Sequence, residues 1–254
     1  MSIDEPKSSI QVIDRMMKLL NVLADHAEPL GLKQLAAQTS LHPSSAHRIL
    51  GVMVEKGFVE RIEPGSYQLG IKLLELGNLV KARINVRQVA LPFMQKLRDE
   101  LDETVNLTLR QGDEIVYIER VTAAKSMMRV VQVVGTRAPL HITAVGKIFL
   151  AEDGQKSCEE YVLRSGMPAY TKDTITTLER LREEVDKAAR AGFALDKEEA
   201  EKGVCCIGAG ICDSSGKLVA GLSISAPAER IDYKWSRRVK DVSAEISRAM
   251  GYNG

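Results

Sequence analysis

The sequence lacks an excess of charge of either sign. Its 254 residues include 35 Lys and Arg against 34 Asp and Glu, a formal net charge of +1 at pH 7. A chain without a basic surplus has no overall electrostatic attraction to nucleic acid. Any binding of nucleic acid would therefore have to come from a local motif.

Long apolar segments, fixed-period repeats and low-complexity stretches are also missing. No apolar run approaches the roughly 18 residues of a membrane-spanning helix. The first residues, MSIDEPKSS, are acidic and polar, unlike a signal peptide. Hydrophobic residues nevertheless make up 44% of the chain, which is ample for buried cores. We therefore expect a soluble cytoplasmic protein of one large or two ordinary domains, with no membrane partner.

Cysteines are few, and three of the four lie in GVCCIGAGIC, Gly203 to Cys212. In a reducing cytoplasm a disulfide framework is not expected. Neighbouring strand residues face opposite sides, so Cys205 and Cys206 cannot easily share an ion, and Cys206 and Cys212 would lie roughly 20 Å apart. No Cys-x-x-Cys pair exists. We expect no metal and no cofactor, and we interpret Cys158, Cys205 and Cys212 as core residues.

Three helical patterns followed by two short strands occupy the first 70 residues. The helices are expected over residues 8–26, 32–39 and 43–57, and the strands at FVERI and SYQLG. This order is that of a winged helix-turn-helix. In the first helix, apolar residues at helical spacing predict an inward face. That predicted face consists of Ile10, Ile13, Met17 and Leu20.

The third helix carries the candidate DNA-binding residues. Its stripe of Ala46, Ile49, Leu50 and Met53 follows helical spacing and is predicted to be buried. The polar residues near its N-terminal end are then exposed, and recognition helices present that end to base edges in the major groove. An arginine there can pair with guanine. The predicted DNA-binding residues are Ser44, Ser45, His47 and Arg48.

A further helix, GIKLLELGNLVKAR, precedes a break at Ile84-Asn85. Another helix begins near Val86. Because Pro92 lies inside it, we expect a kink or a late start there. Strand and helix patterns then alternate, including a strand at 128–134 and a hairpin of residues 204–213 and 217–225. The predicted class is α+β. We expect a DNA-binding domain at 1–70, a linker helix at 71–85 and a larger domain at 86–254.

Several stretches together resemble the IclR family of bacterial transcriptional regulators. They include SLHPSSAHRILGVMVEKGFVER, YQLGIKLLELG, PLHITAVGKIFLA and GFALDKEEAEKGVCCIGAGICDSSGKLVAGLSISAP. The resemblance implies a winged helix-turn-helix, a linker helix and a GAF-like effector-binding domain. It also implies homodimers or homotetramers acting on inverted-repeat operator DNA, with repression as the expected sign. His42-Pro43, GAGI after Ile207 and Ala226 depart from the family pattern, so effector identity is not carried over.

Two segments predict the walls of an effector pocket. The hairpin places Cys206 near Ser223 and Ser225, which share one strand face. Two hydroxyls and a thiol on one face make a poor apolar core and favour a pocket wall. Alternatively, the hydroxyls form hydrogen bonds with nearby backbone groups and line no pocket. Thr143 is a good N-cap, which leaves the backbone amides that follow it free to bind a carboxylate. We interpret Lys147 as a solvated or packing residue, not as a ligand-binding charge. The resemblance adds Asp196, so the predicted pocket for a small organic acid consists of Ala144, Val145, Gly146, Asp196, Cys206, Ser223 and Ser225.

Two other function classes remain open from the sequence. One is a cysteine-dependent hydrolase that uses Cys206 with His141 as its base. The other is a metabolite-sensing module whose helix-turn-helix contacts protein and has no DNA target. No enzyme signature surrounds Cys206 or His141, so we expect a regulator without catalytic residues.

Overall fold

The computed structural model describes residues 11–62, 65–82, 85–123 and 134–253. The chain divides into two compact units, Met1–Arg83 and Ile84–Gly254. The predicted strand at 128–134 falls outside the described residues except for Val134. The break between the units coincides with the break expected at Ile84-Asn85. The assignment of 71–85 as a linker stays a prediction.

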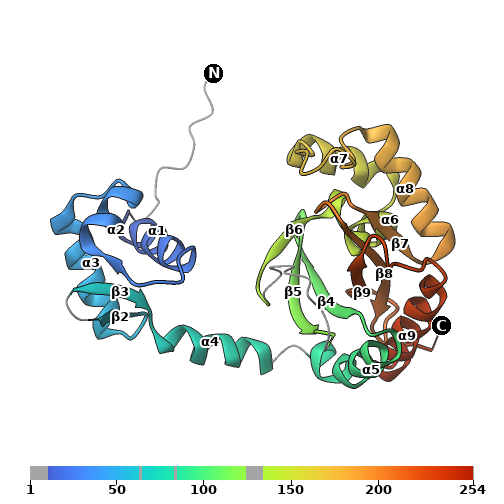
Figure 1. Cartoon of the computed structure of the whole chain (residues 1–254), viewed down its shortest axis with the longest axis horizontal. Coiled ribbons are helices and arrows are strands. Elements are labelled where there is room, and N and C mark those ends of the chain that lie inside the picture. The colour runs from blue at the N-terminus through green and yellow to red at the C-terminus, as the bar shows by residue number, and fades with distance from the viewer. Residues whose placement is uncertain (1–10, 63–64, 83–84, 124–133, 254) are drawn as a thin grey trace. The chain divides into compact units, whose positions relative to one another are not determined.

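The N-terminal unit is a winged helix-turn-helix, as predicted (Figure 1). Three helices and a three-stranded antiparallel sheet of order β1-β3-β2 build it, and one more helix follows. In chain order the elements are α1 (Gln11–Ala24), β1 (Leu30–Gly31), α2 (Leu32–Thr39), α3 (Pro43–Glu55), β2 (Val59–Ile62), β3 (Ser66–Leu69) and α4 (Ile71–Ala82).

The core of this unit confirms the predicted stripe of α3 and corrects that of α1. Ala46, Ile49, Leu50 and Met53 are all buried. In α1 the buried residues are instead Leu19 and Leu23, with Met16 and Leu20 packed against the same core. Ile13 and Met17 are 50% and 45% exposed, so the predicted inward face of α1 is wrong at these two residues and right at Leu20. Ile10 lies outside the described residues.

The C-terminal unit alternates helices and strands around one sheet. In chain order its elements are α5 (Asn85–Leu101), β4 (Thr104–Gln111), β5 (Glu114–Val121), β6 (Arg137–Pro139), the 3₁₀ turn η1 (Leu140–Ile142), α6 (Ala144–Asp153), α7 (Gln155–Ser165), α8 (Leu178–Ala191), β7 (Ala194–Lys197), β8 (Val204–Cys212), β9 (Leu218–Pro227) and α9 (Trp235–Ala249). Helix α5 starts at Asn85 and continues through Pro92, so the expected late start is not observed.

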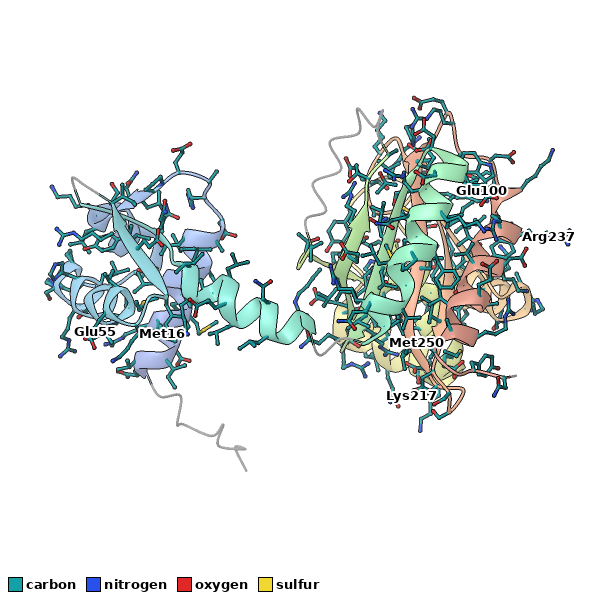
Figure 2. The ribbon with its side chains drawn as sticks, turned by 90° about the horizontal axis from the view of Figure 1, so that it is seen from below. Met16, Glu55, Glu100, Lys217, Arg237 and Met250 are labelled. Carbon is teal, nitrogen blue, oxygen red and sulfur yellow. The ribbon has the colours of Figure 1, made fainter. Side chains whose placement is uncertain are left out.

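The six strands form an antiparallel sheet of order β6-β5-β4-β9-β8-β7, with helices on both faces. Helices α5 and α9 pack on one face, over Val105, Ile207, Leu222 and their neighbours. Figure 2 labels Glu100 of α5 and Arg237 of α9, which mark these adjacent outer helices. Helices α6, α7 and α8 belong to the core on the opposite face, together with Ile115 and Tyr117 of β5. The result is the predicted mixed unit in three layers.

The first turn of α6 lies directly on the neighbouring strands β8 and β9 of the sheet. A Cβ added to Gly221 of β9 would lie 2.0 Å from Cγ1 of Val145, and one added to Gly208 of β8 would lie 2.9 Å from its Cγ2. The Val145 side chain therefore fills a socket that only glycine backbone leaves open. This contact fixes the N-terminal end of α6 against the strands that carry Cys206 and Ser223.

Candidate functional sites

The N-terminal end of α3 is a polar, accessible helix end. Ser44, His47 and Arg48 are exposed and Ser45 is half-buried. His42 is the N-cap: its Nδ1 accepts from the Ser44 amide at 3.4 Å and lies 2.7 Å from Ser44 Oγ. The structure therefore brings the four predicted DNA-binding residues together on an accessible surface. It also gives His42 a role in holding this end, which the sequence did not suggest.

The predicted effector pocket coincides with a small cavity between the start of α6 and the sheet. Five of the seven predicted residues line it, together with four that the sequence had not placed there. The predicted ones are Ala144, Val145, Asp196, Cys206 and Ser223, and the additional ones are Ile115, Tyr117, Thr143 and Ala200.

The helix end that faces the cavity is capped as predicted, but only part of it is free. Thr143 is the N-cap of α6, and its Oγ1 accepts from the Gly146 amide at 3.1 Å. Gly146 is therefore not a free donor, contrary to expectation, and it does not line the cavity. The amides of Ala144 and Val145, at the first two helical positions, have no acceptor within their own helix. An anion at this position would also gain from the helix dipole.

The hairpin register brings the thiol and the two hydroxyls to one face, as predicted. Cys206 pairs with Ser225, and Gly208 pairs with Ser223. Cys206 Sγ lies 3.2 Å from Ser225 Oγ, which also accepts from Asn106 Nδ2 at 3.0 Å. Ser225 is thus engaged behind the cavity. Within the part of the chain that the structure describes, Ser223 makes no side-chain hydrogen bond, so its hydroxyl is available to a ligand.

Asp196 lies in a row of polar groups across the sheet. It sits directly opposite Cys206 in the β7–β8 pair and is 2% exposed. Its Oδ1 accepts from the Glu199 amide at 2.8 Å. Burial, and then the neighbouring Glu199 carboxylate, raise the pKa of Asp196 to about 7. A carboxyl group with this pKa changes its charge near neutral pH.

Lys147 differs from the interpretation that it is solvated or a packing residue. It is fully buried, and its Nζ lies 2.8 and 2.6 Å from the two carboxylate oxygens of Glu199 and 2.5 Å from the Leu195 carbonyl. This ion pair holds the segment after β7 against α6. That segment includes Ala200, which lines the cavity. The pair joins residues 52 positions apart, so periodicity gave no signal for it.

The arrangement does not support a nucleophile and base pair. His141 is buried, its Nδ1 lies 2.7 Å from the Tyr161 hydroxyl, and its Nε2 lies 3.2 Å from the Pro168 carbonyl. Burial lowers the pKa of His141. Burial, and then Asp196, raise the pKa of the Cys206 thiol well above its ordinary value. A neutral thiol beside a serine is a poor nucleophile.

The described residues hold neither a metal-binding cluster nor a membrane-spanning helix. Across the described ranges, no group of three or more His, Cys, Asp and Glu residues is placed to hold a metal ion. All four cysteines are free thiols. None of the helices in the described part of the chain is long and apolar enough to cross a membrane.

Comparisons with known proteins match both units. The IclR helix-turn-helix domain matches residues 12–63, and the family described as "Bacterial transcriptional regulator IclR C-terminal" matches residues 79–250. The HTH-type transcriptional regulator KipR of Bacillus subtilis (strain 168) is 32% identical over 95% of this chain and 98% of its own length. The transcriptional repressor IclR of Escherichia coli (strain K12) is 31% identical over 94% of this chain and 87% of its own.

Solved structures agree along the whole chain. The Thermotoga maritima IclR structure is 32% identical with a TM-score of 0.80, and covers 96% of this chain and 100% of its own. An IclR homologue from Microbacterium hydrocarbonoxydans, solved with 4-hydroxybenzoate, is 25% identical with a TM-score of 0.83. It covers 94% of this chain and 98% of its own. With an accessible helix-turn-helix in one unit and a polar cavity in the other, this chain belongs to the IclR family of bacterial transcriptional regulators.

Proposed function

We propose that this regulator is a cytoplasmic repressor that binds inverted-repeat operator DNA and senses a small organic acid. The observation that carries the proposal is the cavity at the start of α6. Ala144 and Val145, whose amides have no acceptor within α6, line this cavity together with Ser223 and Cys206. Amides at a helix N-terminus favour a carboxylate. The homologue solved with 4-hydroxybenzoate binds such an acid, which supports the same ligand class here.

The proposed DNA contacts are those of the N-terminal end of α3. Arg48 is assigned to a base edge, and Ser44, Ser45 and His47 to bases or phosphates. The acid would alter DNA binding by favouring one arrangement of the subunits over another, which requires unequal affinity for the two arrangements.

The proposed active form is a homodimer. Alternatively, two such dimers associate into a homotetramer. Helix α4 exposes four large apolar residues, and no other helix or strand of the N-terminal unit packs along it among the described residues (Figure 1). Helix α1 exposes a second apolar set. Such faces mark contact surfaces between protein chains. The residues concerned are Ile71, Leu74, Leu76 and Leu79 of α4 and Val12, Ile13 and Met17 of α1.

Selection from a random-sequence DNA pool with the purified full-length protein tests the function. We expect enrichment of an inverted repeat whose half-sites lie about one helical turn apart. Small carboxylates are then added to the enriched DNA complex, and one class should change its affinity. If no sequence is enriched with or without the acids, the protein-contact alternative replaces DNA binding.

The proposal assigns no catalytic step. If Cys206 were a catalytic thiolate, it would react rapidly with iodoacetamide at neutral pH. We expect slow modification of the folded protein, because the thiol is buried and its pKa is raised. Rapid labelling of Cys206 at neutral pH would favour the hydrolase alternative.

A further inference from the structure

Two carboxyl groups share one cation at the wall of the effector cavity. Asp196 and Glu199 are 2% and 5% exposed, and Lys147 is fully buried. Both oxygens of Glu199 contact Lys147 Nζ, whose remaining close contact is the Leu195 carbonyl. Lys147 contacts Glu199 directly, and its charge lowers the pKa of Asp196 less than burial and Glu199 raise it. Across the described ranges, no cation forms an ion pair with Asp196 itself.

Among the described residues, the titratable groups that neighbouring elements bring close to Asp196 are four neutral ones and the Arg120 cation. Cys206 and Cys205 of β8 are thiols, and Tyr117 of β5 and Tyr233 before α9 are phenols; burial raises the pKa of all four and keeps them neutral. Arg120 of β5 interacts electrostatically with Tyr117 and Cys206. The buried set of Lys147, Glu199 and Asp196 thus sums to one negative charge when Asp196 is ionised.

An acid effector would bring a second unpaired carboxylate into this cavity. Two like charges in a buried site cannot both ionise without a large cost, so one group takes a proton. Building on the proposed acid effector, we propose that the pocket binds its acid together with one proton, which is carried by Asp196. Neutralising Asp196 leaves the amides of Ala144 and Val145 to act on the ligand carboxylate.

The surroundings of Asp196 indicate how its carboxyl proton would contact the bound acid. Asp196 Oδ1 accepts the Glu199 amide, and the carboxyl also interacts by a side-chain hydrogen bond with the Cys206 thiol that lines the same cavity. A protonated carboxyl is a donor as well as an acceptor. Asp196 would therefore donate to an oxygen of the bound acid. This makes Asp196 a specificity-determining residue that favours anionic ligands with an acceptor oxygen over neutral or cationic ones.

Isothermal titration calorimetry of the full-length protein tests the proposal. The probes are 4-hydroxybenzoate and glycolate, each titrated in two buffers of different ionisation enthalpy, which reports the protons taken up. Because the free carboxyl has a pKa of about 7, we expect uptake of close to one proton at about pH 8 and close to none at about pH 6. Affinity should fall about tenfold between these pH values, as the protonated fraction falls.

Two variants identify the proton carrier. Asp196→Asn is permanently neutral, so any probe that it binds should bind without proton uptake and with little pH dependence. Asp113→Asn is the matched control, because Arg164 holds the pKa of Asp113 low and far from this pH range. It should keep the wild-type proton uptake.

The outcomes separate this inference from the proposed function. Binding of either probe by wild-type protein without proton uptake at about pH 8 would falsify the proton coupling and leave the acid effector intact. Failure of both acids to bind at either pH would contradict the acid effector, and this inference with it. Proton uptake that survives in Asp196→Asn would assign the proton to another group.

Discussion

Asp196 gives the folded state a pH dependence of its own. Its pKa is about 7 in the fold and ~3.9 in an unfolded chain. Below both values the carboxyl is neutral in both states. As pH rises between them, the unfolded state ionises first and gains stability, so folding loses about 1.4 kcal/mol for each pH unit until the folded pKa is passed.

Replacement of Asp196 by Asn removes this loss while keeping the oxygen that accepts from Glu199. We expect the stability of Asp196→Asn relative to wild type to increase by ~2 kcal/mol from about pH 5.5 to about pH 8, and to level off above pH 7. Urea unfolding of both proteins at several pH values measures it. A difference that stays constant across this range would show that Asp196 is ionised in the fold.

Arg48 makes the most specific prediction for DNA binding. Arg48→Ala should cost roughly 1–3 kcal/mol at one base position and relax the sequence preference there. Lys18→Ala removes the same charge from an exposed position of α1 and is the matched control. It should weaken binding at most uniformly across sequences. Unchanged affinity and preference in Arg48→Ala would remove this residue from the base contacts.

The wall residues on the sheet were predictable, whereas those that depend on long-range contacts were not. Strand alternation and one tight turn are local, and they place Cys206 beside Ser225. Tyr117 reaches the same cavity only because β4 pairs with both β5 and β9, and nothing in the sequence specifies that order. The predicted N-cap Thr143 itself occupies the Gly146 amide, because its Oγ1 accepts from that amide.

At the scale of elements, the ion pair of Lys147 and Glu199 ties α6 to the connection between β7 and β8. Lys147→Met would leave a buried carboxylate without its cation, which typically costs about 3–5 kcal/mol. The double variant Lys147→Met/Glu199→Met removes both charges and should recover most of that loss. Chemical unfolding of the single and double variants measures the coupling. Equal losses in both would mean that packing, not charge, holds this connection.

Helices α1 and α3 of the N-terminal unit show when helical periodicity is sufficient to predict the buried face. Helix α3 buries all four residues of its predicted stripe, while Val52 outside that stripe is 54% exposed. Helix α1 has one broad apolar face opposite a polar one, and its spacing does not say which part of the apolar face is buried. The face around Leu19 packs on the core, and the face with Ile13 and Met17 is left exposed. Packing against α2 and α3 determines which face is buried, and the pattern of one helix alone does not contain that information.

At the scale of the whole molecule, exposed apolar helices predict association. Leu74 and Leu79 of α4 are 58% and 60% exposed, and neither belongs to a core of the described chain. Leu74→Glu/Leu79→Glu should therefore leave each unit folded but convert the assembly to monomers. Light scattering after size-exclusion chromatography measures the mass, and binding to an inverted repeat should weaken with it.

The control for association uses a leucine outside this helix. Leu163 of α7 is 85% exposed, and Leu163→Glu should keep the wild-type mass and DNA affinity. Wild-type protein that is monomeric at working concentrations, or an α4 variant that keeps its mass, would place the contact surface elsewhere.

The socket for Val145 has a consequence for how this chain can change over generations. A side chain at position 221 is tolerated only if the one at position 145 shrinks, because the two occupy the same space. Substitutions at these positions should therefore appear as compensating pairs, with Gly221→Ala harmful alone and rescued by Val145→Ala. A pooled mutational screen for repression would reveal this as epistasis between two sites 76 positions apart. New effector preferences would then arise more readily at Tyr117, Cys206 or Ser223 than at the helix end itself.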